Sequence, residues 1–219
     1  MKLLILGSTG PTGILLIRQA LQDIPDVKII LYVRSPQKIP ADLSSNPAIT
    51  IITGQLTDTE TFSKAFEGVD AVVSALGPVG YSHPSDTPIA AAFAETFEQM
   101  RKHGVRRLVA LSTASIHDPL DKFSLSVSSL VFGVKVFMRG AYNDVVKTGE
   151  NTKELGGDLD WTIVRVPILT NVDSTDVVAG YIGDGKTGVK LSRKGFAKFA
   201  IDELTKREWV QKMPYLSSP

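Results

Sequence analysis

The first residues whose types and spacing could do chemistry form a glycine-rich turn near the start of the chain. Gly7, Gly10 and Gly13 follow an apolar run at the spacing G-x-x-G-x-x-G. Glycines at this spacing let the backbone bend sharply and approach a pyrophosphate, and a helix that begins there adds free N–H groups and the positive end of its dipole. We predict that the turn holds a dinucleotide; the alternative is a turn that only packs a helix against a strand. The residues of this predicted cofactor site are Gly7, Ser8, Thr9, Gly10, Pro11, Thr12 and Gly13.

A basic side chain stands where the adenine ribose of a dinucleotide would lie. About 20 residues after the third glycine, NAD-binding sites carry an acidic residue that binds the ribose 2′-hydroxyl. Here the chain has Arg34 followed by Ser35. A guanidinium group is a bidentate partner for a 2′-phosphate, so Arg34 and Ser35 favour NADP(H) over NAD(H). The alternative is a surface arginine that follows a strand.

Strands alternating with helices must position these residues. Short runs rich in Val, Ile and Leu recur along the first three quarters of the chain, and the stretches between them have helical spacing. This alternation is typical of a parallel sheet covered by helices. Strands are predicted over residues 2–6, 28–33, 49–53, 71–74, 108–111 and 161–164, with a seventh near 189–191. Helices are predicted over residues 12–21, 57–68, 89–101, 141–155 and 196–204.

Local signals support the helix ends, and nothing divides the chain. Thr57 and Glu60 have the spacing of a capping box, Gly68 would close that helix, and Ser192 would cap the last one. We predict an α/β protein with a single-domain Rossmann fold over residues 1–219. Its sheet would be doubly wound and mostly parallel, with six to seven strands and helices on both faces.

Composition narrows the classes of function. The 219 residues are 43% hydrophobic, which suits one domain with a large core. Lys and Arg number 24 against 23 Asp and Glu, so a net charge of +1 gives no general attraction for nucleic acid. The absence of Cys excludes disulfides and thiolate nucleophiles. We expect a cytoplasmic protein with no signal peptide and no membrane span.

Six stretches together resemble a known family. The chain is similar to the atypical short-chain dehydrogenase/reductase superfamily, in the NmrA-like, NAD(P)H-binding branch that also contains flavin and biliverdin reductases. The glycine turn and the D-W-T-I-V-R-x-P stretch are the most specific of the six. They are residues 3–13 (LLILGSTGPTG), 54–58 (GQLTD), 74–77 (SALG), 111–113 (LST), 159–167 (LDWTIVRVP) and 191–194 (LSRK).

The resemblance implies roles for further residues. The glycine turn would hold the pyrophosphate and Arg34 the 2′-phosphate, while Gln55 and Leu56 would border the adenine. Relatives have an Asp in the place of Gln55, but an amide can also form hydrogen bonds with adenine. The remaining positions would line the cofactor toward and around the nicotinamide: Ala75, Leu76, Gly77, Ser112, Thr113, Val166 and Pro167.

The catalytic pattern of the superfamily is incomplete in this chain. Ketone-reducing relatives use a Tyr four residues before a Lys on one helix, where the cation lowers the pKa of the phenol. Lys147 fits the Lys position, but Asn143 stands where the Tyr would be, and Tyr142 is rotated by about 100°. The predicted catalytic residues are Thr113 for a substrate oxygen, Lys147 for the nicotinamide ribose, and Tyr142 if the helix start is irregular.

The three histidines are too scattered for a metal site, and no metal is predicted. His103 suits the C-terminal end of a helix. His83 and His117 follow strands at the edge where doubly wound folds bind ligands, so either could donate a proton. Asp118 has the character of a turn residue.

A long apolar stretch lies between the motifs at residues 111–113 and 159–167. Residues 123–138 are rich in Phe, Leu and Val, and we interpret them as a flap over a substrate pocket, a dimer contact or a membrane-surface contact, with core packing as the plain alternative. Loops 77–87 and 115–139 and the C-terminal segment would form the substrate pocket. The chain would act as a monomer or homodimer.

Taken together, these features predict an oxidoreductase that uses NADP(H). Its substrate would be small, apolar and conjugated, such as a quinone or flavin, because such acceptors take hydride without a Tyr donor. One alternative is a non-catalytic NmrA-like redox sensor that binds the dinucleotide. Another is an isomerase or cyclase on the same scaffold, with His83, His117 and Asp118 as the acid–base groups.

Overall fold

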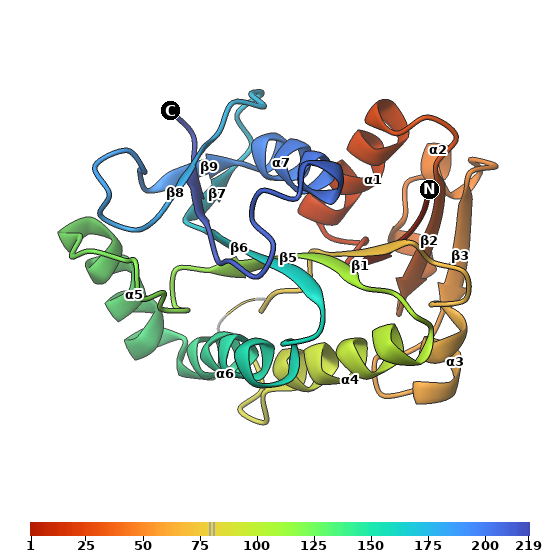
Figure 1. Ribbon diagram of the computed structural model, residues 1–219, viewed down its shortest axis with the longest axis horizontal. Helices are drawn as coiled ribbons and strands as arrows, with labels where there is room; N and C mark the ends of the chain where they lie inside the picture. The colour runs from red at the N-terminus through yellow and green to blue at the C-terminus, as the bar shows by residue number, and fades with distance from the viewer. Residues whose placement is uncertain (79, 81) are drawn as a thin grey trace.

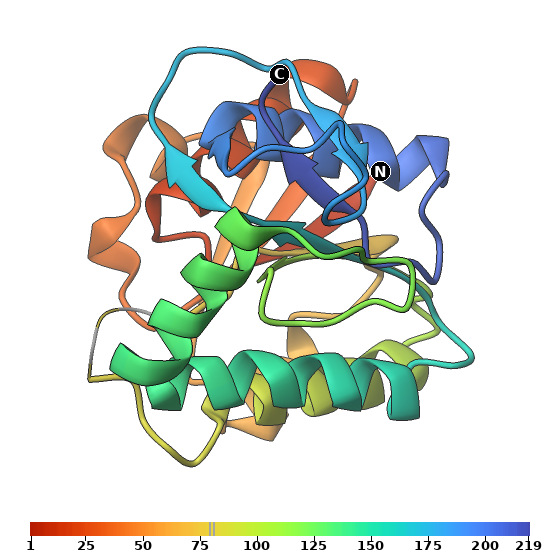
Figure 2. The same ribbon diagram turned by 90° about the vertical axis from the view of Figure 1, so that its left-hand side faces the viewer.

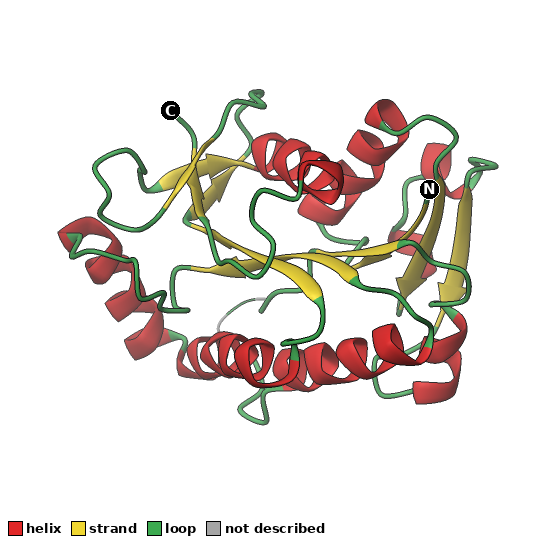
Figure 3. Ribbon diagram, viewed as in Figure 1, coloured by secondary structure: helices red, strands yellow, loops and turns green. Residues whose placement is uncertain are grey.

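The computed structural model describes residues 1–78, 80 and 82–219, and it has the α/β architecture that the alternation predicts (Figure 3). Its main sheet has eight strands in the order β3-β2-β1-β4-β5-β6-β10-β8. All neighbours pair in parallel except β8, which runs antiparallel to β10. These strands are β1 (Lys2–Leu6), β2 (Lys28–Val33), β3 (Ile49–Thr53), β4 (Ala71–Ser74), β5 (Arg107–Thr113), β6 (Asp160–Val166), β8 (Val178–Gly180) and β10 (Tyr215–Ser217).

Helices cover both faces of this sheet (Figure 1). One face carries α1 (Pro11–Asp23), α2 (Ala41–Ser44) and α7 (Arg193–Lys206). The opposite face carries α3 (Thr59–Lys64), α4 (Pro88–Lys102) and α6 (Arg139–Leu155). The fold is therefore a doubly wound Rossmann fold, as predicted.

Side-chain alternation along the buried strands creates one core on each face of the sheet. In β1, Leu3 and Ile5 join the core under α1 and α7, whereas Leu4 and Leu6 join the core under α3, α4 and α6. Successive side chains of a strand point to opposite faces, and a strand buried on both faces is apolar throughout. This explains why the central predicted strands are rich in Val, Ile and Leu at successive positions.

The strand prediction was correct for the first six strands. The predicted total of six to seven strands was too low, because the main sheet has eight. The segment near 189–191 does form a strand, β9 (Lys190–Ser192), but it pairs with β7 (Ile168–Thr170) in a separate two-stranded sheet. The seventh and eighth places of the main sheet belong to β10 and β8. These two strands have only three residues each, too short to show a periodic pattern.

The capping prediction at the third helix was displaced by one residue. Asp58, not Thr57, caps α3, because its carboxylate accepts a hydrogen bond from the Thr61 N–H (3.1 Å). The helix ends at Lys64, before Gly68, which has a left-handed φ of 65°. Ser192 caps α7 as predicted, accepting from the Lys194 N–H.

A buried ion pair fastens the segment after β5 to the sheet. Arg165 in β6 is fully buried and donates to both carboxylate oxygens of Asp121, at 2.5 and 2.8 Å. The same guanidinium donates to the carbonyls of Ile116 and Met213. A buried charge is stable only when it is paired and hydrogen-bonded, and these contacts meet that requirement. They fix the position from which the apolar stretch begins.

The apolar stretch itself forms a helix, α5 (Leu125–Phe137), outside the two main layers. Figure 2 shows it on the surface, crossing the end of α6 at an angle. Its inner side packs Val127 and Val131 against a small cluster that contains Ile182 and Tyr215. Its outer side is exposed, so core packing accounts for only one face of the helix. No helix among the described residues is long and apolar enough to cross a membrane.

Candidate dinucleotide site and adjoining pocket

The site lies where the strand order reverses. β1 and β4 are neighbours, with Leu6 opposite Ser74, and the chain leaves them toward helices on opposite faces of the sheet. In doubly wound folds, ligands bind in the crevice outside the carboxyl ends of the strands at this switch point. The glycine turn follows β1, and residues 75–78 follow β4, so both predicted motifs border the crevice.

Two of the three glycines in the turn are required by the fold. Gly7 has a left-handed φ of 72°, and a Cβ there would lie 2.7–2.8 Å from the backbone of Ala75 and Leu76. A Cβ on Gly13 would lie 2.3 Å from the Gly7 carbonyl oxygen. Both contacts are with backbone atoms that cannot rotate away. These glycines let the turn pack tightly between the two strands and α1.

The second glycine of the turn is not required by the fold. Gly10 has an ordinary φ of −83°, and the nearest atom to a Cβ at this position would be the Gly7 carbonyl oxygen at 3.7 Å. This is a normal van der Waals distance, so the protein alone would accept a side chain. Glycine at such a position suits a ligand that approaches the backbone closely, as a pyrophosphate does.

The start of α1 is open to an anion. Gly10 is its N-cap residue and supplies no side-chain cap, Pro11 follows, and the first turn contains no acidic residue. In the described part of the chain, the N–H groups of Thr12 and Gly13 have no hydrogen-bond partner. The Ser8 hydroxyl is buried beside them, also without a partner. Free donors and a helix dipole together fit a phosphate group.

Arg34 lies at the same edge of the sheet, past the end of β2. Its side chain is exposed and forms no ion pair within the described residues. It borders a hollow of about 400 Å³ at the ends of β2 and β3, where Gln55 and Asp58 also lie. The Tyr32 phenol donates to the Gln55 carbonyl (2.8 Å) and so joins the end of β2 to the loop after β3. The structure thus brings the predicted 2′-phosphate residue and the predicted adenine residue Gln55 together.

The other predicted cofactor residues also lie near the carboxyl edge of the sheet. Ser35 begins the turn after β2 and is half-buried, and Leu56 packs on the core below α3 and α4. Val166 ends β6 opposite Thr113 of β5, and Pro167 follows it. These positions agree with a cofactor lying across the strand ends, and their roles stay predictions.

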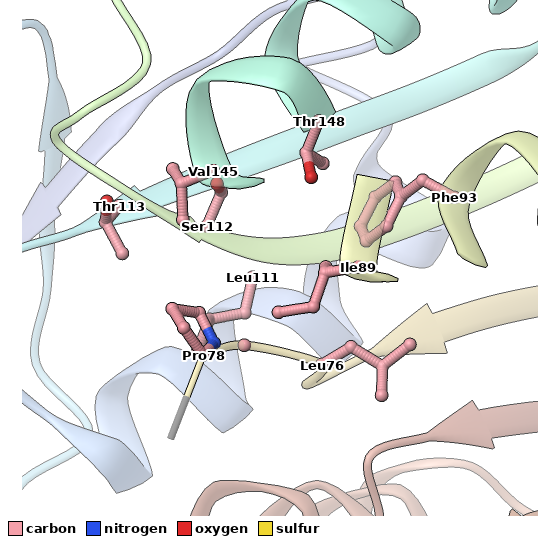
Figure 4. Close-up of a pocket in the computed structure, with 10 residues that line it drawn as sticks. Leu76, Pro78, Ile89, Phe93, Leu111, Ser112, Thr113, Val145 and Thr148 are labelled. Atoms are coloured by element: carbon pink, nitrogen blue, oxygen red, sulfur yellow. The ribbon is translucent and has the colours of Figure 1, made fainter. Parts of the chain in front are cut away.

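A small, mostly apolar pocket lies between α4, α6 and the ends of β4 and β5 (Figure 4). Ser112 and Thr113 supply hydroxyl groups from β5, and Thr113 is the labelled residue farthest from Phe93 in this view. The Thr148 hydroxyl also reaches the pocket but donates to the Asp144 carbonyl (2.8 Å). The pocket is lined by Leu76, Gly77, Pro78, Ile89, Phe93, Leu111, Ser112, Thr113, Val145 and Thr148.

Two predicted catalytic residues do not reach this pocket. The Lys147 ammonium group is exposed and lies 3.3 Å from the Glu150 carboxylate, and Asn143 one turn earlier is also exposed. The face of α6 toward the pocket carries Val145 and Thr148 instead. Tyr142 is half-buried, with the Lys135 ammonium group 5.5 Å from its ring centroid. The rotation of α6 therefore separates both predicted residues from Thr113.

This placement gives a first testable prediction. We expect Lys147→Gln to change the dissociation constant for NADPH by no more than about two-fold, because an exposed ion pair with Glu150 contributes little. Isothermal titration calorimetry measures the constant, with Lys153→Gln on the same helix as a control. Weakening of ten-fold or more for Lys147→Gln alone would instead return Lys147 to the cofactor site.

A buried histidine–carboxylate pair beside the pocket was not predicted. Asp144 of α6 is fully buried, and its Oδ2 accepts from His83 Nε2 (2.7 Å) and from the Ile89 N–H (2.9 Å). Its Oδ1 accepts from the Ala90 N–H (2.7 Å), so this side chain caps α4 from another helix. His83 is thus a structural partner of Asp144, a role different from the predicted proton donor. The signal was an Asp on the apolar face of the predicted helix.

The remaining acid–base candidates lie elsewhere. His117 is exposed, and Asp118 borders a separate hollow beside Trp161 and Met213. Of the segments expected to form the substrate pocket, loop 77–87 supplies Gly77 and Pro78. Loop 115–139 and the C-terminal segment line none of this pocket within the described residues, and their part in a substrate pocket stays a prediction.

The fold and the crevice define a dinucleotide-binding Rossmann protein. Residues 7–207 match the model of the NAD(P)H-binding family, and the chain belongs to this family. The match confirms the resemblance to the NAD(P)H-binding branch of the atypical short-chain dehydrogenases/reductases.

Solved structures agree in fold. A short-chain dehydrogenase/reductase from Veillonella parvula in complex with NADP is 18% identical, with a TM-score of 0.82 over 100% of this chain and 94% of that chain. A Rossmann-fold NAD(P)-binding family protein from Shigella flexneri is 22% identical, with a TM-score of 0.70 over 100% and 93%. The oxidoreductase ylbE from Lactococcus lactis is 18% identical, with a TM-score of 0.76 over 100% and 91%.

Proposed function

We propose that this protein is an oxidoreductase that uses NADP(H) and acts on a small, apolar, conjugated substrate. The observation that carries the proposal is Gly10, a glycine that the fold does not need, at the open start of α1. The same edge of the sheet holds Arg34 on one side of the turn and the apolar pocket on the other. The V. parvula relative that binds NADP supports the choice of cofactor.

The chain's own residues would bind and orient the cofactor. The N–H groups at the start of α1 would bind the pyrophosphate, since they are free and lie at the positive end of the helix dipole. Arg34 would pair with the 2′-phosphate, because a guanidinium group forms two parallel bonds with a phosphate. When bound, the nicotinamide ring supplies or accepts a hydride.

The pocket has a volume of about 10 Å³, so it would contact only the edge of a substrate that lies against the strand ends. Its apolar side chains exclude water and favour a flat, apolar molecule, while Ser112 and Thr113 can donate hydrogen bonds to a substrate oxygen. The described lining contains no carboxylate, imidazole, phenol or ammonium group. The chemistry of this lining, which offers hydroxyl groups but no strong acid, suits the edge of a quinone- or flavin-like acceptor, because such an acceptor can take its proton from water.

The cofactor preference can be tested at Arg34. We expect Arg34→Gln to weaken NADPH binding by about ten- to a hundred-fold, because hydrogen bonds between charged groups contribute roughly 1.5–3 kcal/mol. Binding of NADH, which has no 2′-phosphate, should change by less than about two-fold. Calorimetric titration of both nucleotides measures the difference.

Arg106→Gln is the matched control, since Arg106 is an exposed arginine at the opposite end of the parallel strands. It should leave both constants unchanged. Equal losses of NADPH and NADH binding in Arg34→Gln would contradict a contact with the 2′-phosphate.

The missing proton donor also supports a second candidate, a dinucleotide-binding redox sensor without catalysis. The Lys147 and Asn143 positions face solvent, so the usual catalytic pair is absent from the pocket. Incubating the protein with NADPH and a panel of quinones and flavins distinguishes the two candidates. Consumption of NADPH that depends on the protein supports the oxidoreductase, and tight binding with no consumption supports the sensor.

A further inference from the structure

The outer face of α5 is an exposed apolar surface. We define the α5 patch as Phe123, Leu125, Phe132, Val136 and Phe137, whose exposed fractions are 82%, 71%, 68%, 52% and 75%. Leu125, Phe132 and Val136 are 7 and 4 residues apart, so they form one stripe along the helix. The stripe lies opposite Val127, which packs inward. An apolar patch of this kind marks an interaction surface.

The helix is apolar on both sides, and only one side is covered by its own chain. Val127 and Val131 already bury the inner side against Ile182 and Tyr215. Figure 2 shows no other element in front of α5. A helix that is apolar all round is normally buried, so the outer side calls for a partner.

Along the α5 segment the charges are of one sign. The neighbouring loop, whose Gly183 approaches the backbone of Lys122 and Phe123, carries Asp184, and this carboxylate accepts from backbone N–H groups of its own loop. From Lys122 to Asn143 the charged residues are Lys122, Lys135 and Arg139, all exposed, with no Asp or Glu between them. None of the three forms an ion pair within the described chain. Of the two acids just before this segment, Asp121 is committed to Arg165, and Asp118 accepts from the Leu120 N–H. The net charge of the whole chain is only +1, so the positive charge is local.

We propose that the α5 patch is a docking surface for an anionic lipid bilayer. Apolar side chains beside basic ones are the pattern of a helix that lies in the membrane interface, with Phe and Leu in the acyl region and Lys and Arg at the headgroups. A second copy of the chain fits less well, because a two-fold contact would place Lys135 and Arg139 of both copies near each other. The attachment is peripheral.

Vesicle sedimentation tests this proposal with the full-length protein. The protein should sediment with vesicles of phosphatidylcholine and phosphatidylserine, much less with phosphatidylcholine alone, and less as salt is raised. The double variant Phe132→Asp, Val136→Asp should lower the partition coefficient at least about ten-fold. Lys135→Gln should lower it by about five-fold, as expected for one basic residue near the surface.

Two control variants test whether the loss of vesicle binding is specific to the α5 patch. Leu155→Asp changes a partly exposed apolar residue at the far end of α6, and Lys28→Gln changes an exposed lysine at the start of β2. Both should bind vesicles like the unaltered protein, and circular dichroism should report the same fold for all variants. Absence of sedimentation with anionic vesicles, or equal sedimentation with both vesicle types, overturns the proposal. A dimer in sedimentation equilibrium that Phe132→Asp dissociates also overturns it, in favour of a second copy.

Discussion

Asp121→Ala is expected to destabilise the protein by roughly 3–5 kcal/mol, the cost of leaving a buried charge without its partner. Asp121 is only 6% exposed, and Arg165 is fully buried. The Asp121 carboxylate also accepts from the N–H groups of Asp118 and Ile182, at 2.9 and 3.1 Å. The substitution would remove all these bonds and leave the guanidinium with two carbonyl acceptors. Urea denaturation followed by tryptophan fluorescence measures the loss.

An exposed ion pair provides the control. Asp158 lies at the surface, with Oδ1 2.7 Å from Arg101 Nη2, so Asp158→Ala should shift the denaturation midpoint little. The double variant Asp121→Leu, Arg165→Met should recover part of the stability lost in Asp121→Ala, because it removes the unpaired charge. If Asp121→Ala denatures at the same urea concentration as the unaltered protein, the pair does not stabilise the fold.

The same pair predicts a dependence on pH. Burial alone would raise the pKa of the Asp121 carboxyl, but hydrogen bonds from Arg165 and from the Asp118 N–H outweigh it and hold the pKa below its usual range. A group with a lowered pKa in the folded state stabilises fully above its unfolded pKa, about 3.9 for Asp, and loses this contribution as the pH falls through the folded value. The stability difference between the unaltered protein and Asp121→Ala should therefore be large at pH 7 and shrink in acid.

The parts of the fold that were predictable are those with long, regular patterns. The run before Gly7 is apolar at every position, which identified β1 as a strand buried on both faces. The spacing of Ile14, Leu15 and Ile17 identified α1 in the same way. By contrast, β8 and β10 are three residues long, and their place in the sheet depends on pairing that no local pattern encodes.

In the candidate site, too, the residues that local sequence predicts differ from those whose placement depends on distant contacts. The turn and Arg34 were predictable because each follows a recognisable strand, so their positions along the chain place them at the carboxyl edge. That Lys147 does not line the pocket was not predictable, because a four-residue spacing gives the relative direction of two side chains but not the rotation of the helix on the sheet. The observed rotation places Asp144 on the buried face, where it caps α4. A contact 54 residues apart in the chain is not visible in local spacing.

Gly10→Ala is expected to leave the fold intact and to weaken NADPH binding by about ten- to a hundred-fold, equivalent to 1.4–2.8 kcal/mol. The methyl group would lie 3.7 Å from the Gly7 carbonyl oxygen and meet no closer atom of the chain. The loss of a glycine N-cap and the reduced freedom of the unfolded chain roughly cancel, so the free energy of unfolding should change by less than about 1 kcal/mol. A bound pyrophosphate would meet the methyl group, since it needs close approach to this backbone.

Two other glycines make this test specific to ligand binding. Gly157→Ala adds a methyl group into open space far from the turn and should change neither stability nor binding. Gly13→Ala forces a Cβ to within 2.3 Å of the Gly7 carbonyl oxygen, so it should lower stability as well as binding. Calorimetric titration with NADPH and urea denaturation measure the two quantities for each variant. If Gly10→Ala binds NADPH as tightly as the unaltered protein, the turn only packs α1 against β1, and the dinucleotide must be held elsewhere.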